Sequence, residues 1–212
     1  GEEGFALQAD ATLDADGLPE DLLALFPRTA RELIEDIGVR VDGSVRGRNL
    51  HLDIERSPGD DRLATDLTGT IFASRASAEA GIPLTEIDGR LDIEARTLTG
   101  RAPEFTVDVA ADRLRAAGVR MSDAHARFRH GPTPGSVLVP AITGAIHGGR
   151  LAGSAQILPV EDAASDAERR YWLDAQLSRV RTAPLLRDLG VGDEAADGAW
   201  SEVGDTSRGV LD

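Results

Sequence analysis

The sequence has no cysteine, no lysine and one methionine, and only 4% of its residues are aromatic. Without cysteine the chain has neither a disulfide nor a thiol nucleophile. Without lysine it has no Walker-type phosphate loop. No apolar run reaches about 18 residues, so no bilayer-spanning helix is expected. The 212 residues are enough to fold around an aliphatic core without a metal or a disulfide.

The charge is strongly acidic and contains no basic block. Arginine supplies all 23 basic residues against 37 Asp and Glu, so the net charge is −14 and the isoelectric point is about 4.7. Nucleic-acid binding requires cations that displace counterions from phosphates, and a polybasic membrane anchor requires clustered cations along the chain. Neither kind of partner is expected from this sequence.

Apolar residues fall at alternate positions rather than at helical spacing, which predicts half-buried β-strands. Polar residues fill the intervening positions, so each strand presents one apolar and one polar face, as in an antiparallel sheet. We expect strands at 5–13, 50–54, 91–95, 105–111 and 173–177.

A pattern of aliphatic, any residue, Gly, any residue, aliphatic occurs at 41–45, 67–71, 87–91 and 142–146. Glycine inside a strand is typical of a bulge, a bend or a close backbone approach. The four copies predict a repeated β-unit, and glycines at equivalent places in successive strands would let the sheet curl. The fold class expected is mainly β with a few short helices, as a curved antiparallel-rich β-sheet or β-groove.

Two segments break the alternation and predict helices. Residues 19–37 carry two short apolar stripes, with Pro19 and Pro27 at first-turn positions and Gly38 as a stop. Residues 183–189 form a shorter helix, with Thr182 as its N-cap and Gly190 as its stop. We expect one β-groove segment over 1–212, with the helical insertion at about 19–37 and no interdomain linker. The ends of the chain suggest a piece of a longer protein.

The search for catalytic or metal chemistry gives weak candidates only. Residues 10–21 resemble the middle of a calcium loop but lack its first and twelfth ligands. The four histidines, His51, His125, His130 and His147, lack the spacing of a zinc site and are expected on the surface or in loops. Acid pairs are abundant but are expected to be solvated surface. We therefore expect no enzyme activity, no cofactor and no metal.

One stretch of the chain combines a strand, a reversal and a returning strand. Residues 142–157 contain Gly148-Gly149, expected to supply the positive φ of a tight hairpin. An alternating strand at 171–180, a helix at 182–189 and a strand beginning at 206–212 follow. This succession resembles the C-terminal region of the AsmA-like envelope proteins related to TamB, and the likeness extends over about 18–212.

The resemblance implies a protein that projects into the periplasm from an inner-membrane anchor outside this chain. Its strands would form a long groove with an apolar inside that shields lipid acyl chains, in phospholipid transport between membranes or in outer-membrane assembly. The partners implied are phospholipid acyl chains, neighbouring segments of the parent chain and other envelope proteins. The alternative is a β-repeat scaffold or adhesion module that contacts protein and binds no lipid.

The expected groove lining consists of inward-facing aliphatic and aromatic residues on adjacent strands, chosen by hydrophobicity alone. They are Leu91, Ile93, Phe105, Val107, Val109, Val119, Met121, Phe128, Ile146, Leu151, Ile157, Leu173 and Leu177.

Overall fold

A computed structural model describes residues 4–16, 40–57, 62–79, 83–133, 135–159 and 169–191. In this part of the chain, nine strands form one antiparallel sheet, followed by one short helix. The elements are β1 (Phe5–Asp16), β2 (Arg40–Arg56), β3 (Ala64–Glu79), β4 (Pro83–Leu98), β5 (Glu104–Ala116), β6 (Val119–His130), β7 (Val137–Ile146), β8 (Gly149–Pro159), β9 (Arg169–Ser178) and α3 (Thr182–Asp188).

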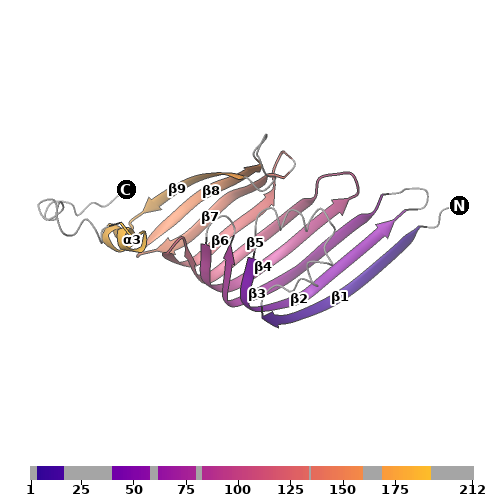
Figure 1. Ribbon diagram of the computed structural model, residues 1–212, viewed down its shortest axis with the longest axis horizontal. Helices are drawn as coiled ribbons and strands as arrows, with labels where there is room; N and C mark the ends of the chain where they lie inside the picture. The colour runs from indigo at the N-terminus through magenta and orange to yellow at the C-terminus, as the bar shows by residue number, and fades with distance from the viewer. Residues whose placement is uncertain are drawn as a thin grey trace, which may run out of the picture.

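The strands lie in the sheet in the order in which they occur in the sequence, and each pairs antiparallel with the next. The sheet is not closed, and β1 and β9 are its edges (Figure 1). Nine strands spaced about 4.8 Å apart give a sheet about 40 Å wide. The mainly β, curved antiparallel fold predicted from the sequence is confirmed, and so are the five predicted strands.

One face of the sheet is apolar from edge to edge. Directly paired residues form a row that takes one residue from each strand and contains no polar side chain, here named the apolar row. Its members are Leu13, Gly47, Ile71, Leu91, Val109, Ala126, Ile142, Gly153 and Ala175.

The adjacent row on the opposite face is largely polar, because successive side chains of a strand point to opposite faces. Its members, again directly paired, are Asp14, Arg46, Phe72, Arg90, Ala110, His125, Thr143, Ala152 and Gln176. The alternation along each strand therefore becomes a division between the two faces of the whole sheet.

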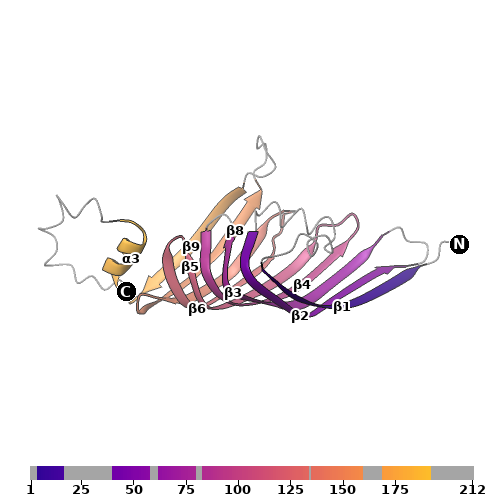
Figure 2. The same ribbon diagram turned by 60° about the horizontal axis from the view of Figure 1, so that its bottom comes forward.

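A line of irregularities crosses five neighbouring strands and bends the sheet. Gly43 on β2, Arg75 on β3, Glu86 on β4 and Asp123 on β6 all have positive φ, between 49° and 103°. On β5, Asp112 is left out of the ladders with both neighbours. Bulges of this kind bend a strand. Figures 1 and 2 show strand ends turning up over the sheet near β3 to β6.

The apolar pattern allows for the extra residue at each bulge. An inserted residue would move every later side chain to the other face. Near the bend, however, the spacing between apolar residues changes from two to three, as in Ala73 and Ala76 on β3 or Ala111 and Leu114 on β5. Ala76 beside the bend is fully buried. The apolar face therefore continues through the bend.

The glycines of the repeated pattern are not directly paired across neighbouring strands. Gly69 pairs with Ile93, whereas Gly89 pairs with Ala73, four residues further along β3. Of the four glycines in the repeated pattern, Gly43 lies at a bulge and has a φ of 103°. Gly89 borders the register shift between β4 and β5, and Gly144 lies opposite the shift between β6 and β7. The bend comes from bulges at mixed residue types, and the remaining glycines make room for neighbouring atoms.

The hairpin between β7 and β8 is present, but its turn lies one residue earlier than expected. His147 and Gly148 have φ of 46° and 83°, which makes them the two central residues of the turn. Gly149 is the first residue of β8 and its φ is not positive. A Cβ on Gly149 would lie 2.3 Å from the Ser178 carbonyl oxygen. Gly149 is thus required by close backbone approach, and only Gly148 by φ.

Helix α3 confirms the predicted second helix, with one correction at its start. The N-cap is Arg181 without a side-chain capping bond, and Thr182 is the first helical residue rather than the cap. Gly190 has φ of 69° and its N–H donates to the Arg187 carbonyl at 3.0 Å, so the predicted stop is confirmed. The predicted helices at 19–37 and the strand at 206–212 lie outside the described residues.

Candidate functional site

The apolar face is the candidate site, and the structure brings all the predicted lining residues onto it. Leu91 and Ile93 lie on β4, opposite Val109 and Val107 of β5, and Val107 faces Phe128 of β6. The remaining predicted residues occupy the same face: Phe105 on β5, Val119 and Met121 on β6, Ile146 on β7, Leu151 and Ile157 on β8, and Leu173 and Leu177 on β9. The residues chosen by hydrophobicity therefore share one face of β4 to β9.

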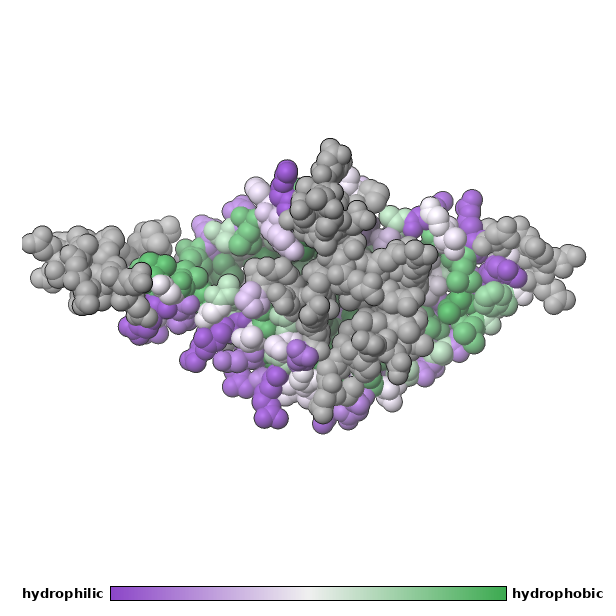
Figure 3. All heavy atoms as spheres, viewed as in Figure 1, coloured by the Kyte–Doolittle hydropathy of each residue, from purple (hydrophilic) through white to green (hydrophobic). Residues whose placement is uncertain are grey.

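This face is most exposed at the two edge strands. Leu7 on β1 is 53% exposed and Leu173 on β9 is 65% exposed, although both are large aliphatic residues. Figure 3 shows hydrophobic residues gathered towards both ends of the face that Figure 1 views, with hydrophilic residues along the lower rim. An apolar face that reaches both edges in this way has aliphatic surface available for contact with an apolar ligand or a further strand.

Four of the predicted lining residues lie beneath α3 instead of in an open groove. Val119 and Ile146 are buried in a cluster with Val180, and Leu151 and Leu177 pack against it. Leu185 of α3 packs on the same cluster. The helix therefore closes this end of the apolar face.

Sequence reasoning missed the first three strands as part of the site. Val45, Leu50 and Ile71 form a second buried cluster, with Leu13, Leu91 and Ile93 packed on it. Leu50 occupies space left by two glycines, since a Cβ on Gly47 or Gly69 would lie 2.7 Å or 2.5 Å from its methyl carbons. The alternation of apolar and polar residues at 5–13 and 50–54 could have assigned β1 and β2 to the site. Hydrophobicity could not have identified Ala126 and Ala175 of the apolar row, because their side chains are small.

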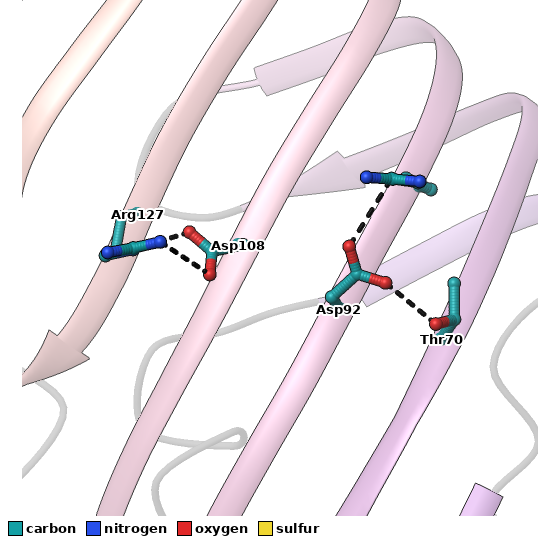
Figure 4. Close-up of polar contacts among 5 residues, drawn as sticks. Thr70, Asp92, Asp108 and Arg127 are labelled. Atoms are coloured by element: carbon teal, nitrogen blue, oxygen red, sulfur yellow. Dashed lines mark hydrogen bonds and ion pairs between the residues drawn. The ribbon is translucent and has the colours of Figure 1, made fainter. Parts of the chain in front are cut away.

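The opposite face is covered by polar contacts between neighbouring strands. Arg127 of β6 donates through Nε and a terminal nitrogen to Asp108 of β5, at 2.6 and 3.1 Å. Thr70 of β3 donates to Asp92 of β4 at 2.7 Å (Figure 4). Asp108 also raises the pKa of Arg127 above its ordinary value by accepting these bonds. Exposed pairs of this kind contribute little stability, so their main effect is to keep this face hydrated.

Asp88 fixes the bend. Its carboxylate accepts the Arg75 backbone N–H at 2.8 Å and pairs with Arg113 of β5. Ser74 also donates to it, at 3.4 Å. These partners lower the pKa of Asp88 below its ordinary value, with the Arg75 N–H as the largest cause and Arg113 next. One side chain of β4 thus holds the bulge of β3 and the neighbouring strand β5.

His51 connects the edge strand β1 to β2. Its Nδ1 lies 2.8 Å from Asp10 of β1, and its Nε2 lies 3.0 Å from Asp53 of its own strand. The hydrogen bonds to Asp10 and then Asp53 raise the pKa of His51 above 6.5. Two carboxylates can accept from both ring nitrogens at once only when the imidazole is protonated. Among the described residues, no group of three His, Asp or Glu is placed to hold a metal ion.

His147 is the one histidine of the four whose side chain is largely buried. Its Nε2 lies 3.0 Å from an Asp188 carboxylate oxygen, so this contact ties the β7–β8 hairpin to α3. The Arg120 backbone N–H donates to the same oxygen at 3.4 Å. The contact is a structural link, and no nucleophile accompanies it among the residues described.

Two open depressions are formed by the described residues. One, of about 400 Å³, is lined by the β4–β5 and β6–β7 loops, where Phe105 meets His130 edge to face at 6.3 Å. The other, of about 650 Å³, lies over β6 to β9 and is lined mainly by small residues and by Asp123 and Arg150. The first depression also contains Glu104 and Ser136. The Ser136 hydroxyl, however, donates to the Thr133 carbonyl at 2.6 Å, and the His130 Nδ1 accepts from the Phe105 backbone N–H at 3.3 Å.

No helix in the described ranges has the length and apolar character needed to cross a membrane. No protein-family model, curated protein or solved structure matches this chain.

Proposed function

We propose that this chain is a segment of an AsmA-like envelope protein whose apolar sheet face shields lipid acyl chains. The parent protein would be anchored in the inner membrane and project into the periplasm, and it would act in phospholipid transport or outer-membrane assembly. Neighbouring segments of the parent and other envelope proteins would be its protein partners. No catalytic step, cofactor or metal is part of this proposal.

The observation that carries the proposal is the apolar row, which crosses nine paired strands without a polar side chain. At about 40 Å, it is longer than one leaflet of a bilayer is deep, because the whole hydrocarbon core measures about 30 Å. Each methylene that leaves water for such a face gains about 0.8 kcal/mol. The bend and the hydrated opposite face would leave only one side of the sheet available to acyl chains.

The test measures acyl-chain binding after a charged side chain is placed at the centre of the apolar face. Val107 lies between Ile93 and Phe128, so Val107→Asp would put a carboxylate in contact with any bound chain. Burying an unpaired carboxylate costs several kcal/mol. We expect co-purifying phospholipid, measured by native mass spectrometry and lipid extraction, and uptake of a fluorescent fatty acid to be lost.

The matched control is Ala110→Asp, which adds the same charge to the same strand on the opposite face. Ala110 is paired with Arg90 and His125, so the new carboxylate would meet a cation there. This variant should bind lipid as the wild type does. Val107→Thr keeps the branched shape and tests the site if Val107→Asp fails to fold. Equal binding by a folded Val107→Asp would place lipid elsewhere, and a lipid-free wild type would favour the scaffold or protein-contact module.

A further inference from the structure

The end of the sheet at which α3 lies gathers arginines from four separate segments. This α3 end consists of the turns at 117–118 and 147–148, the connection 179–181 and the helix itself (Figures 1 and 2). The arginines on or beside it are Arg115, Arg120, Arg150, Arg179, Arg181 and Arg187. The sequence contains no basic block because these residues come together only when the chain folds.

Five of the six arginines have no carboxylate partner among the described residues. Arg115 pairs with Glu86 at 3.3 Å, and the Arg181 Nε donates to the His147 carbonyl at 3.2 Å. Asp188, the acid of α3, faces His147. The exposed guanidinium groups that remain belong to Arg120, Arg150, Arg179 and Arg187.

Large apolar side chains are exposed at the same end. Leu186 and Leu189 are 45% and 49% exposed, and Val191 just beyond the helix is 56% exposed. Leu185 on the inner side of α3 is used in the buried cluster. Exposed aliphatic groups beside unpaired arginines are typical of surfaces that lie in the interfacial region of a membrane.

We propose that the α3 end docks on a bilayer surface with anionic headgroups. Its arginines would contact lipid phosphates, while Leu186, Leu189 and Val191 enter the acyl boundary. Because the Debye length at physiological salt is about 8 Å, acids that lie further than this from the α3 end contribute little to the potential there. This inference rests on the proposed function, since it names the end at which the apolar face would exchange chains with a membrane.

The experiment is flotation of the full chain with vesicles of phosphatidylglycerol and phosphatidylethanolamine, compared with pure phosphatidylcholine. We expect binding to the anionic vesicles only, weakening from 50 to about 300 mM NaCl. A basic residue near an anionic surface contributes about a fivefold gain in binding. Arg179→Gln with Arg187→Gln should therefore weaken binding about 25-fold, and Arg120→Gln with Arg150→Gln gives a second, independent pair. Leu186→Ser should weaken binding without changing the salt dependence.

The matched control is Arg129→Gln with Arg170→Gln. It removes two exposed arginines that lie at the ends of β6 and β9 farthest from α3. This pair should bind as the wild type does. Inorganic phosphate at equal ionic strength should compete no better than NaCl, which separates a membrane surface from a free phosphate site. An equal loss in the control pair, or equal binding to neutral vesicles, would overturn the proposal.

The full chain is a stringent test because the sequence beyond Val191 is acidic. That segment carries one arginine and the acids Asp193, Glu194, Asp197, Glu202, Asp205 and Asp212. Fatty-acid uptake is measured on the same arginine variants. Retained uptake with lost vesicle binding supports docking at α3, whereas vesicle binding without any uptake would contradict the trough and leave the docking surface standing.

Discussion

Gly149 provides the most direct test of how the β7–β8 hairpin is built. In Gly149→Ala the new Cβ would lie 2.3 Å from the Ser178 oxygen and 2.6 Å from atoms of Arg179 and Val180. All three are backbone atoms, so no side chain can rotate away and the connection to α3 has to move. In Gly148→Ala the nearest atom is the Arg181 Nε at 3.7 Å, and the only cost is the left-handed φ.

The two costs differ in origin and in size. Overpacking costs about 1–3 kcal/mol, and a shift that half exposes Val180 and Ile146 adds about 1 kcal/mol for each. Gly149→Ala should therefore lower the free energy of unfolding by about 3–5 kcal/mol, or about 10 °C in Tm for a chain of this length. A left-handed residue with a Cβ costs about 1–2 kcal/mol, so Gly148→Ala should lose about 4 °C.

Thermal unfolding followed by circular dichroism measures both variants, and asparagine separates the two causes. Asparagine tolerates the left-handed region, so Gly148→Asn should be close to the wild type. Gly149→Asn should remain as unstable as Gly149→Ala, because its Cβ meets the same backbone. A smaller loss at Gly149 than at Gly148 would refute the close-approach explanation and restore the positive-φ explanation for Gly149.

Three further perturbations test the bend, the edge strand and the packing of the apolar face. Asp88→Asn keeps an acceptor for the Arg75 N–H and Asp88→Ala does not, so Tm should fall in the order wild type, Asn, Ala. The contribution of Asp88 to stability should be present above its ordinary pKa of 3.8 and should vanish as the pH falls through its lower pKa in the folded state. Because the pKa of His51 is raised, its contribution to stability should be complete below pH 6.5 and should be lost as the pH rises through the folded pKa. Urea titrations at several pH values measure this contribution. A His51→Gln variant with unchanged pH dependence would contradict it. Gly69→Ala should cost about 1–3 kcal/mol and Leu50→Ala about 2–5 kcal/mol, but the double variant less than their sum, because the new methyl fills space that Leu50 leaves; strict additivity in chemical denaturation would show that the two sites are independent.

The arginines of the α3 end come from distant parts of the sequence. Read along the chain, the arginines are scattered among acids and predict no membrane surface. Antiparallel hairpins place the start of one strand beside the end of the next. Arg120, Arg150 and Arg179 therefore lie at the same end of the sheet, although about 30 residues separate each from the next.

The sequence alone determined five of the strands, the segment of the β7–β8 hairpin and the short helix, because a period of two is a local property that a strand carries by itself. It could not determine the bend. A single change in the spacing of apolar residues, as between Ala111 and Leu114, indicates a bend only because bulges at Asp123 and Glu86 lie beside it on the neighbouring strands. The turn at His147 and Gly148 was misplaced by one residue because the crowding that requires Gly149 comes from Ser178 and Val180, some 30 residues away. Local alternation thus defined the apolar face, and contacts between distant segments decided its curvature, its closure under α3 and the charge at that end.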